Sequence, residues 1–181
     1  MAEKLVILSD MWGSKKGLWI TSYLGYLQQY FDIQYYDTQH LAGVDLVVCT
    51  PENLFEAFQN GGMDTAVAQL LNKENKPCHY LTFCAGGTVV WNAALQGLPM
   101  KSLYAISPID LPLNAAKPDC PVRLLHGEKD KGLPTEEWAA SKGVSLEILP
   151  KYGHGLYSDE KIVQKVCLSL LDSVIHKKFQ L

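Results

Sequence analysis

The strongest constraint on the fold is a regular alternation of short apolar runs with longer amphipathic stretches. Apolar or alternating runs of this length are typical of strands, which we expect at residues 4–9, 32–36, 79–83, 102–106, 122–125 and 145–149. Apolar residues at helical spacing predict helices at residues 17–30, 52–58, 63–71, 88–95, 134–140 and 159–177. The run 45–49 is either a further short strand or a buried approach to the next helix. This order predicts an α/β protein, a three-layer αβα sandwich with a mostly parallel central sheet.

Length and composition indicate a single domain spanning residues 1–181. Of the 181 residues, 48% are hydrophobic and 19% are charged, which excludes a largely disordered chain. The formal net charge is -3, which disfavours a protein that binds nucleic acid by neutralising phosphates. No apolar run reaches the ~18 residues of a membrane span, so no membrane partner is expected.

The number and spacing of the cysteines predict that the protein occupies a reducing compartment. An odd number of thiols at irregular spacing argues against a disulfide framework, and the first apolar run is too short for a secretory signal. We therefore expect a cytoplasmic protein with free thiols. No CxxC pair is present and the histidines are scattered, so the sequence predicts no metal site.

The segment LTFCAGG places Cys84 between an expected strand and an expected helix. A residue at so sharp a turn adopts a strained backbone, and small residues such as Gly86 are needed where helix and strand nearly touch. The backbone N–H of Ala85 is placed to bind an oxyanion, and the helix N-terminus favours a thiolate at position 84. Cys84 is therefore the candidate nucleophile.

Two further segments supply partners for a thiol. Asp130 follows the strand at 122–125 in the sequence HGEKD, and His154 follows the strand at 145–149 between two glycines. Both belong at the carboxyl edge of a parallel sheet, where Cys84 also lies and where ligands of open α/β sheets bind. A nucleophile, a histidine and an orienting acid form a catalytic triad. His126 is interpreted as structural, holding the turn.

With these residues the chain resembles a small member of the α/β-hydrolase superfamily. The order nucleophile, acid, histidine is that of the superfamily, and the cysteine elbow is similar to that of dienelactone hydrolases. The segment SDMWG resembles the HGWG oxyanion loop of carboxylesterases that cleave pimeloyl-carrier-protein methyl esters. The resemblance implies a minimal α/β-hydrolase fold and Trp12 or Met11 as the second oxyanion donor beside Ala85.

The function predicted in this way is a cofactor-independent acyl hydrolase that cleaves a carboxylic ester, a thioester or a lactone. The short proline-rich loop at 108–121 leaves no room for a lid, so an open pocket lined by this loop, Trp12, Phe83 and Trp91 is expected. Its substrate is a small acyl compound, either free or bound to a carrier. The protein is expected to be a monomer or a homodimer.

Two alternatives stay open. The sequence has Thr82 where the elbow usually has glycine, and Asp10-Met11 where the oxyanion loop usually has His-Gly. These departures motivate a catalytically weak binding or partner module. The string His126-Gly127-Glu128 also fits the His-x-Glu of class I glutamine amidotransferases, which pair it with a cysteine elbow.

Overall fold

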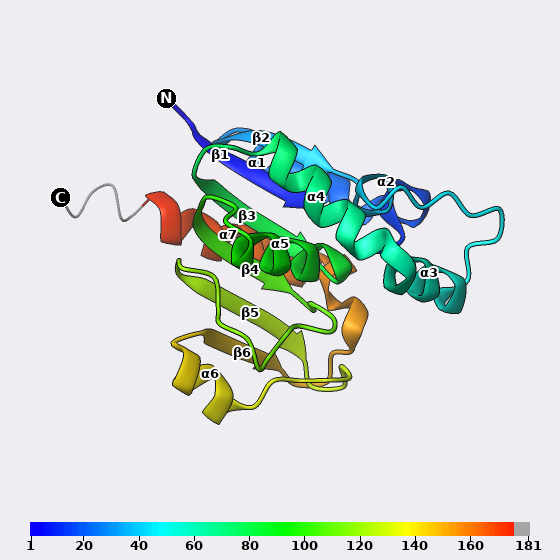
Figure 1. Cartoon of the computed structure of the whole chain (residues 1–181). Coiled ribbons are helices and arrows are strands. Elements are labelled where there is room, and N and C mark those ends of the chain that lie inside the picture. Colours follow the sequence, from blue (N-terminus) through cyan, green and yellow to red (C-terminus); the bar gives the residue numbers. More distant parts are fainter. Residues whose placement is uncertain (176–181) are drawn as a thin grey trace.

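A computed structural model of the chain describes residues 1–175, and these residues form a six-stranded sheet in which all strands are parallel (Figure 1). The strands in spatial order are β2 (Phe31–Tyr36), β1 (Glu3–Leu8), β3 (Cys78–Phe83), β4 (Met100–Ile106), β5 (Val122–Gly127) and β6 (Ser145–Leu149). The predicted fold class is confirmed, and the sheet is wholly rather than mostly parallel.

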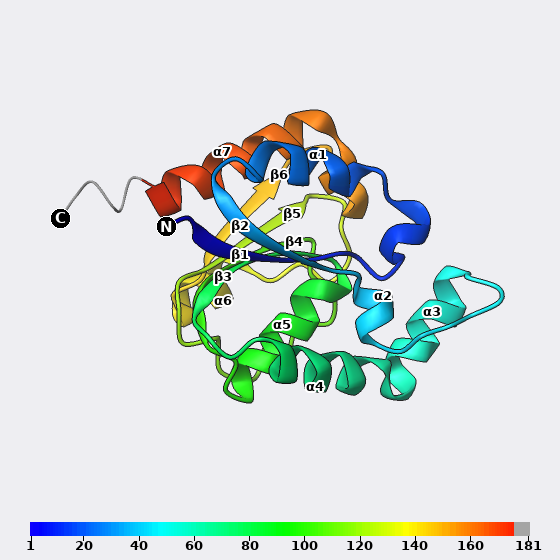
Figure 2. The ribbon, with the colours of Figure 1, turned by 90° about the horizontal axis from the view of Figure 1, so that it is seen from above.

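Helices cover both faces of this sheet, as the predicted three layers require. Figure 2 shows α1 (Trp19–Leu27) and α7 (Glu160–Ile175) on one face and α4 (Met63–Lys73) and α5 (Ala85–Leu95) on the other. The shorter helices are α2 (Thr38–Leu41), α3 (Pro51–Ala57) and α6 (Glu136–Lys142), with helical turns η1 (Gly13–Lys16), η2 (Phe58–Gly62) and η3 (His154–Ser158).

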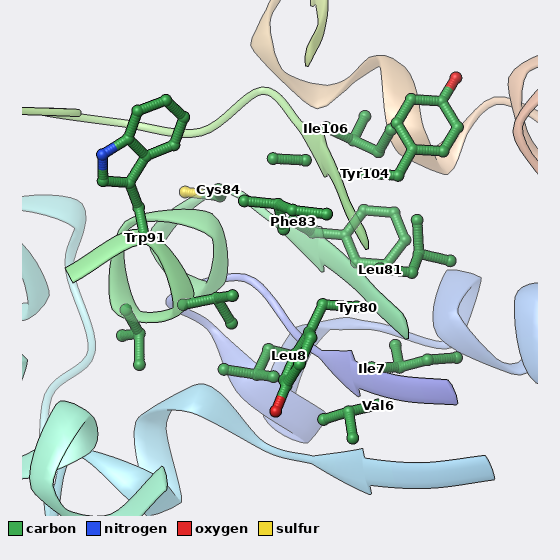
Figure 3. Close-up of a cluster of buried hydrophobic side chains, with 14 of the residues drawn as sticks. Val6, Ile7, Leu8, Tyr80, Leu81, Phe83, Cys84, Trp91, Tyr104 and Ile106 are labelled. Atoms are coloured by element: carbon green, nitrogen blue, oxygen red, sulfur yellow. The ribbon is translucent and has the colours of Figure 1, made fainter. Parts of the chain in front are cut away.

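The core lies on both sides of the central strands. The last four residues of β1 and the last four of β3 are buried, as expected for parallel strands covered on both faces by helices. Figure 3 shows side chains of β1, β3, β4 and α5 gathered in this core, with Val6, Leu81 and Tyr104 among them. The same burial explains why these strands read as nearly continuous apolar runs in the sequence.

The strand order creates one special position at the carboxyl edge of the sheet. From β1 the chain crosses to β2 on one side, and later to β3 on the other. Crevices outside such a reversal point are where open α/β sheets bind ligands. The loop after β1 and the turn after β3 are therefore neighbours at the place where a site is expected.

The run 45–49 is neither a strand nor buried, so this part of the interpretation was wrong. Val47 is fully exposed, and residues 42–50 form a loop that extends from the body of the molecule before α3 (Figures 1 and 2). Both sides of β1 are already paired with β2 and β3, and the chain uses this segment to connect α2 to α3. Short apolar composition alone did not distinguish a strand from a connection.

Smaller differences concern helix ends. Helix α6 begins after its N-cap Thr135, so Pro134 precedes the helix instead of lying in its first turn. Helix α2 was not predicted, and its N-cap Asp37 accepts a hydrogen bond from the His40 N–H. Residues 176–177 of the predicted last helix lie outside the described residues. Within residues 1–175, no helix has both the length and the apolar character needed to cross a membrane.

Candidate active site

Cys84 occupies a sharp turn between β3 and α5 (Figure 3). Its φ of 49° and ψ of -122° lie in a region that residues with a side chain rarely adopt, at a cost of about 1–3 kcal/mol. The Cys84 N–H donates to the carbonyl oxygen of Ile106 at 3.0 Å, which anchors the turn to β4. The strained turn that the sequence predicted is therefore present.

Two glycines after Cys84 allow the turn to pack closely. A Cβ atom at Gly86 would lie 2.5 Å from the carbonyl oxygen of Ser9, and one at Gly87 would lie 2.9 Å from the Cβ of Pro108. Neither distance is compatible with an unstrained side chain. The start of α5 therefore rests directly on the loop after β1 and on the loop after β4.

His154 connects Cys84 to Asp130. Its Nδ1–H donates to Asp130 Oδ1 at 2.9 Å, which leaves Nε2 as the ring nitrogen for the thiol. Hydrogen bonds with Asp130 and then with Cys84 raise the pKa of His154 to about 10. The imidazole is consequently protonated at neutral pH, so the cation faces the sulfur. The structure brings the three predicted residues together in the order that a triad requires.

Asp130 also binds a second histidine. The Nδ1–H of the buried His126 donates to Asp130 Oδ2 at 3.1 Å, and the Lys131 N–H donates to Oδ1 at 2.9 Å. Burial alone would raise the pKa of Asp130, but the hydrogen bonds from His126 and His154 outweigh it and hold that pKa well below its usual range. Asp130 is thus a fixed anion between two rings.

The loops that carry Asp130 and His154 are joined by hydrogen bonds that backbone N–H groups of both loops donate. The Lys129 N–H donates to the Tyr152 carbonyl oxygen at 2.9 Å, and the Lys151 N–H donates to Glu128 Oε2 at 2.9 Å. A Cβ at Gly127 would lie 2.5 Å from the same Tyr152 oxygen, so only glycine permits this approach. The Asp130–His154 distance is set by backbone contacts as well as by the side chains.

The loop after β1 decides which backbone N–H groups are free to bind an oxyanion. The Trp12 N–H donates to Asp10 Oδ1 at 3.0 Å, so it already has an acceptor. Within residues 1–175, neither the Met11 N–H nor the Ala85 N–H has a hydrogen-bond acceptor. Of the two predicted second donors, Met11 is the one whose N–H is available.

A cavity of about 590 Å³ opens beside His154. Its walls come from the loop after β4, from the Asp130 loop and from single residues near them, and they include Met11, Phe55, Ile109, Leu111, Leu113 and His126. Segment 107–121, which supplies several of these walls, contains no helix or strand.

Two of the predicted pocket residues are core residues instead. Phe83 and Trp91 are completely buried, and neither lines the cavity. Phe83 packs against Trp19 with ring centroids 4.7 Å apart, and Trp91 lies 6.2 Å from the ring of Trp138 on α6. Phe83 is the last residue of the buried strand β3 and Trp91 lies on a buried face of α5, so neither side chain has access to solvent. Trp12 also lies outside the cavity walls, with its ring beneath the Lys16 ammonium group.

The His-x-Glu interpretation is not supported by the contacts. His126 binds Asp130, and Glu128 is exposed and accepts the Lys151 N–H. The residue that binds Cys84 is His154, which has no role in that interpretation. Among the described residues, no group of three or more histidine, cysteine, aspartate or glutamate side chains is placed to bind a metal ion.

Sequence reasoning missed three contributors to the site. His126 was interpreted as holding the turn, and its hydrogen bond to Asp130 spans that turn; what was missed is that the same bond fixes the acid. Asp10 and Tyr157 were given no role, although the Tyr157 hydroxyl donates to Asp10 Oδ2 at 3.0 Å across 147 residues of chain. For Asp10 a local signal existed, since aspartates commonly accept the backbone N–H two residues on. No local signal could have found Tyr157.

No family model matches the sequence, and no curated protein matches it. Solved structures do. A protein of the α/β-hydrolase superfamily from Xanthomonas campestris is 17% identical with a TM-score of 0.67, covering 95% of this chain and 99% of its own. Mouse α/β hydrolase domain-containing protein 10 is 13% identical with a TM-score of 0.68, covering 96% and 90%. A dienelactone-hydrolase-like promiscuous phosphotriesterase from metagenomic libraries is 13% identical with a TM-score of 0.63, covering 97% and 86%.

These comparisons establish the fold. The chain has the α/β-hydrolase fold, as its resemblance to that superfamily implied, and the likeness extends over nearly all of its length. At identities this low, the neighbours assign neither the catalytic residues nor the substrate.

Proposed function

We propose that the protein is a small acyl hydrolase that uses Cys84 as its nucleophile on a carboxylic ester, a thioester or a lactone. The observation that carries this proposal is the continuous chain from Cys84 through His154 to Asp130, beside a cavity and next to two unpaired backbone N–H groups. A merely structural cysteine does not require a strained backbone, a cationic histidine and an anchored acid together.

The first half of the reaction forms an acyl-enzyme. The Cys84 thiolate attacks the carbonyl carbon, a C–S bond forms, and the carbonyl oxygen becomes an oxyanion held by the N–H groups of Ala85 and Met11. Each such donor contributes roughly 2.7–4 kcal/mol to the transition state. The tetrahedral intermediate collapses as His154 passes its Nε2 proton to the leaving alcohol or thiol. Asp130 keeps the imidazole in the tautomer that this transfer requires.

The second half releases the acid. His154, now neutral, takes a proton from water while the oxygen of that water attacks the thioester carbonyl. The same two N–H groups hold the second oxyanion. Expulsion of the Cys84 thiolate restores the ion pair with His154 and gives the carboxylic acid. No step needs a metal ion or an organic cofactor.

The residues that line the cavity favour an acyl substrate that is largely apolar. Met11, Ile109, Leu111 and Leu113 supply apolar surface, and the open cavity beside the site leaves room for a group presented by a carrier. A small acyl compound, either free or carrier-bound, is therefore the proposed substrate class.

A panel of short-chain p-nitrophenyl esters and acyl thioesters tests the proposal. The wild type should turn over at least one member, whereas Cys84→Ala and His154→Ala should lose turnover while keeping the circular dichroism spectrum of the wild type. Cys49→Ala is the matched control, because this thiol is free and donates only to the Leu46 carbonyl oxygen away from the site. Retained turnover in Cys84→Ala would contradict the proposal.

One observation favours a non-catalytic binding module as the second candidate. Only 2% of the Cys84 surface is exposed, and Cys84 is not among the residues that line the cavity. If no ester or thioester is turned over and Cys84 resists alkylation at neutral pH, this second candidate replaces the first.

A further inference from the structure

The loop after β1 carries a buried carboxylate that the proposed reaction does not use. Asp10 is 3% exposed, and both of its oxygens accept hydrogen bonds: Oδ1 from the Trp12 N–H at 3.0 Å and Oδ2 from the Tyr157 hydroxyl at 3.0 Å. Burying a carboxylate costs several kcal/mol unless its partners compensate, so such a residue is expected to have a specific task.

Asp10 connects the loop after β1 to the segment that carries the histidine. Tyr157 lies one helical turn after His154 within η3, and the two rings are 6.1 Å apart. The carbonyl oxygen of Tyr157 accepts a hydrogen bond from the Tyr23 hydroxyl at 3.0 Å, which ties the backbone at Tyr157 to α1. The hydroxyl that binds Asp10 therefore comes from a well-anchored ring.

The same loop lies against the turn of the nucleophile. In the pairing of β1 with β3, Leu8 is the partner of Thr82, so continuing this register by two residues sets Asp10 level with Cys84. The carbonyl oxygen of Ser9 is in contact distance of Gly86, as the 2.5 Å to its virtual Cβ shows. Residues 9–11 therefore run beside residues 83–85.

The charge of Asp10 is directed away from the reaction. A carboxylate that pointed at an oxyanion would oppose it, but both Asp10 oxygens face N–H or O–H donors. Burial raises the pKa of Asp10, while hydrogen bonds from Tyr157, Trp12 and the Gly13 N–H, and then the nearby His154, counteract that rise. What Asp10 controls is the direction of backbone groups.

We propose that Asp10, held by Tyr157, is a positioning residue that engages the Trp12 N–H and thereby turns the Met11 N–H, together with that of Ala85, toward the oxyanion. Without this contact, both the Met11 N–H and the Trp12 N–H would be free to act as the second oxyanion donor. The inference rests on the proposed acyl hydrolase and specifies its second oxyanion donor. It also explains why an acidic residue is tolerated at a position beside the nucleophile.

The test compares two reactions of Cys84 in the full-length chain. Ester hydrolysis needs an oxyanion site, whereas alkylation by iodoacetamide forms a C–S bond, expels iodide and develops no oxyanion. In Asp10→Ala we expect kcat to fall about 100-fold, as for loss of one oxyanion donor, with KM and the alkylation rate changed less than about threefold. Asp10→Asn keeps an acceptor for the Trp12 N–H and should restore most of kcat. Tyr157→Phe removes only the hydroxyl that donates to Asp10, so its kcat should lie between the values of Asp10→Ala and Asp10→Asn.

Asp159→Ala is the matched control, because Asp159 Oδ1 accepts the N–H of Lys161 two residues on, in the same local geometry but on the surface. It should leave both reactions unchanged. A normal kcat in Asp10→Ala would overturn the inference, and so would a parallel loss of hydrolysis and alkylation, which indicates a collapsed site.

Amide hydrogen exchange separates this inference from the proposed function. In the wild type the Trp12 amide should be protected and the Met11 amide should exchange freely, and Asp10→Ala should abolish the protection of Trp12. The reverse pattern in the wild type would overturn the inference whether or not the protein hydrolyses esters. A wild type that shows the expected exchange but no turnover on any ester would contradict the acyl hydrolase alone.

Discussion

The carboxylate of Asp130 accepts hydrogen bonds from His154 and His126 at once, one on each oxygen. This arrangement leaves the carboxylate little freedom to rotate, so the ring of His154 is held in one orientation. His126 therefore acts on the proposed reaction through Asp130 and not through the thiol. Both histidines border the cavity, but they differ in exposure, since the side chain of His126 is buried and that of His154 is 38% exposed.

The pKa of His154 gives the first prediction at the residue scale. Because this pKa is raised to about 10, the imidazolium persists through neutral pH and is lost only as the pH rises through about 10. Hydrolysis, which needs that proton for the leaving group, should decline along an alkaline limb near pH 10. Proton NMR of the His154 ring against pH measures the same ionisation directly.

Substitutions can separate the contributions of the two hydrogen bonds that raise the pKa of His154. Asp130→Asn should lower the pKa of His154 most, and Cys84→Ala should lower it less, following the order of the two hydrogen bonds. A His154 ring that titrates near 6.5 in the wild type would show that the ion pair does not form.

At the scale of elements, glycines remove side chains at two contact points, one between the turn after β3 and the loop after β1, the other between the loops after β5 and β6. Gly86 lets α5 approach the loop after β1, and Gly127 lets the Asp130 loop approach the His154 loop. Both contacts are with backbone carbonyl oxygens, which cannot move aside as a flexible side chain can. The site is therefore as sensitive to these glycines as to the triad.

Replacing Gly127 tests this sensitivity. The added Cβ of Gly127→Ala would lie 2.5 Å from the Tyr152 carbonyl oxygen and should lower the free energy of unfolding by about 1–3 kcal/mol. It should also reduce ester hydrolysis, because the Asp130 and His154 loops are pushed apart. Chemical denaturation and steady-state kinetics measure the two effects.

Gly25 supplies the control for that substitution. A Cβ at Gly25 meets no atom within 4 Å, and the residue lies inside α1. Gly25→Ala should therefore stabilise the protein by roughly 0.5–1 kcal/mol without changing hydrolysis. Equal changes in the free energy of unfolding and in hydrolysis for Gly127→Ala and Gly25→Ala would contradict the close packing described for Gly127.

Across the whole molecule, the features that could be predicted from the sequence are those that local sequence patterns determine. Buried parallel strands leave apolar runs, and residues just after such strands meet at one edge of the sheet, so the sequence alone predicted that Cys84, Asp130 and His154 lie together. The predictions from sequence failed where contacts between distant parts of the chain determine the structure. The run 45–49 has strand-like composition but forms an exposed connection between α2 and α3, and Phe83 and Trp91 lie in the core against aromatic rings of other elements.

The oxyanion loop shows the same limit. The motif SDMWG predicted a donor at Met11 or Trp12. The Trp12 N–H instead binds Asp10, which in turn binds Tyr157 at the other end of the chain. A contact between residues so far apart leaves no trace in local spacing. Only the folded molecule resolves it.

If Cys84 is the nucleophile, it carries the acyl group during turnover, and mass spectrometry of the protein during reaction with a p-nitrophenyl ester detects this acyl-enzyme. We expect a transient adduct of one acyl mass on the peptide that contains Cys84 at short reaction times, and no such adduct in Cys84→Ala. Turnover of the ester without any adduct on Cys84, or with an adduct on another residue, would show that Cys84 is not the nucleophile.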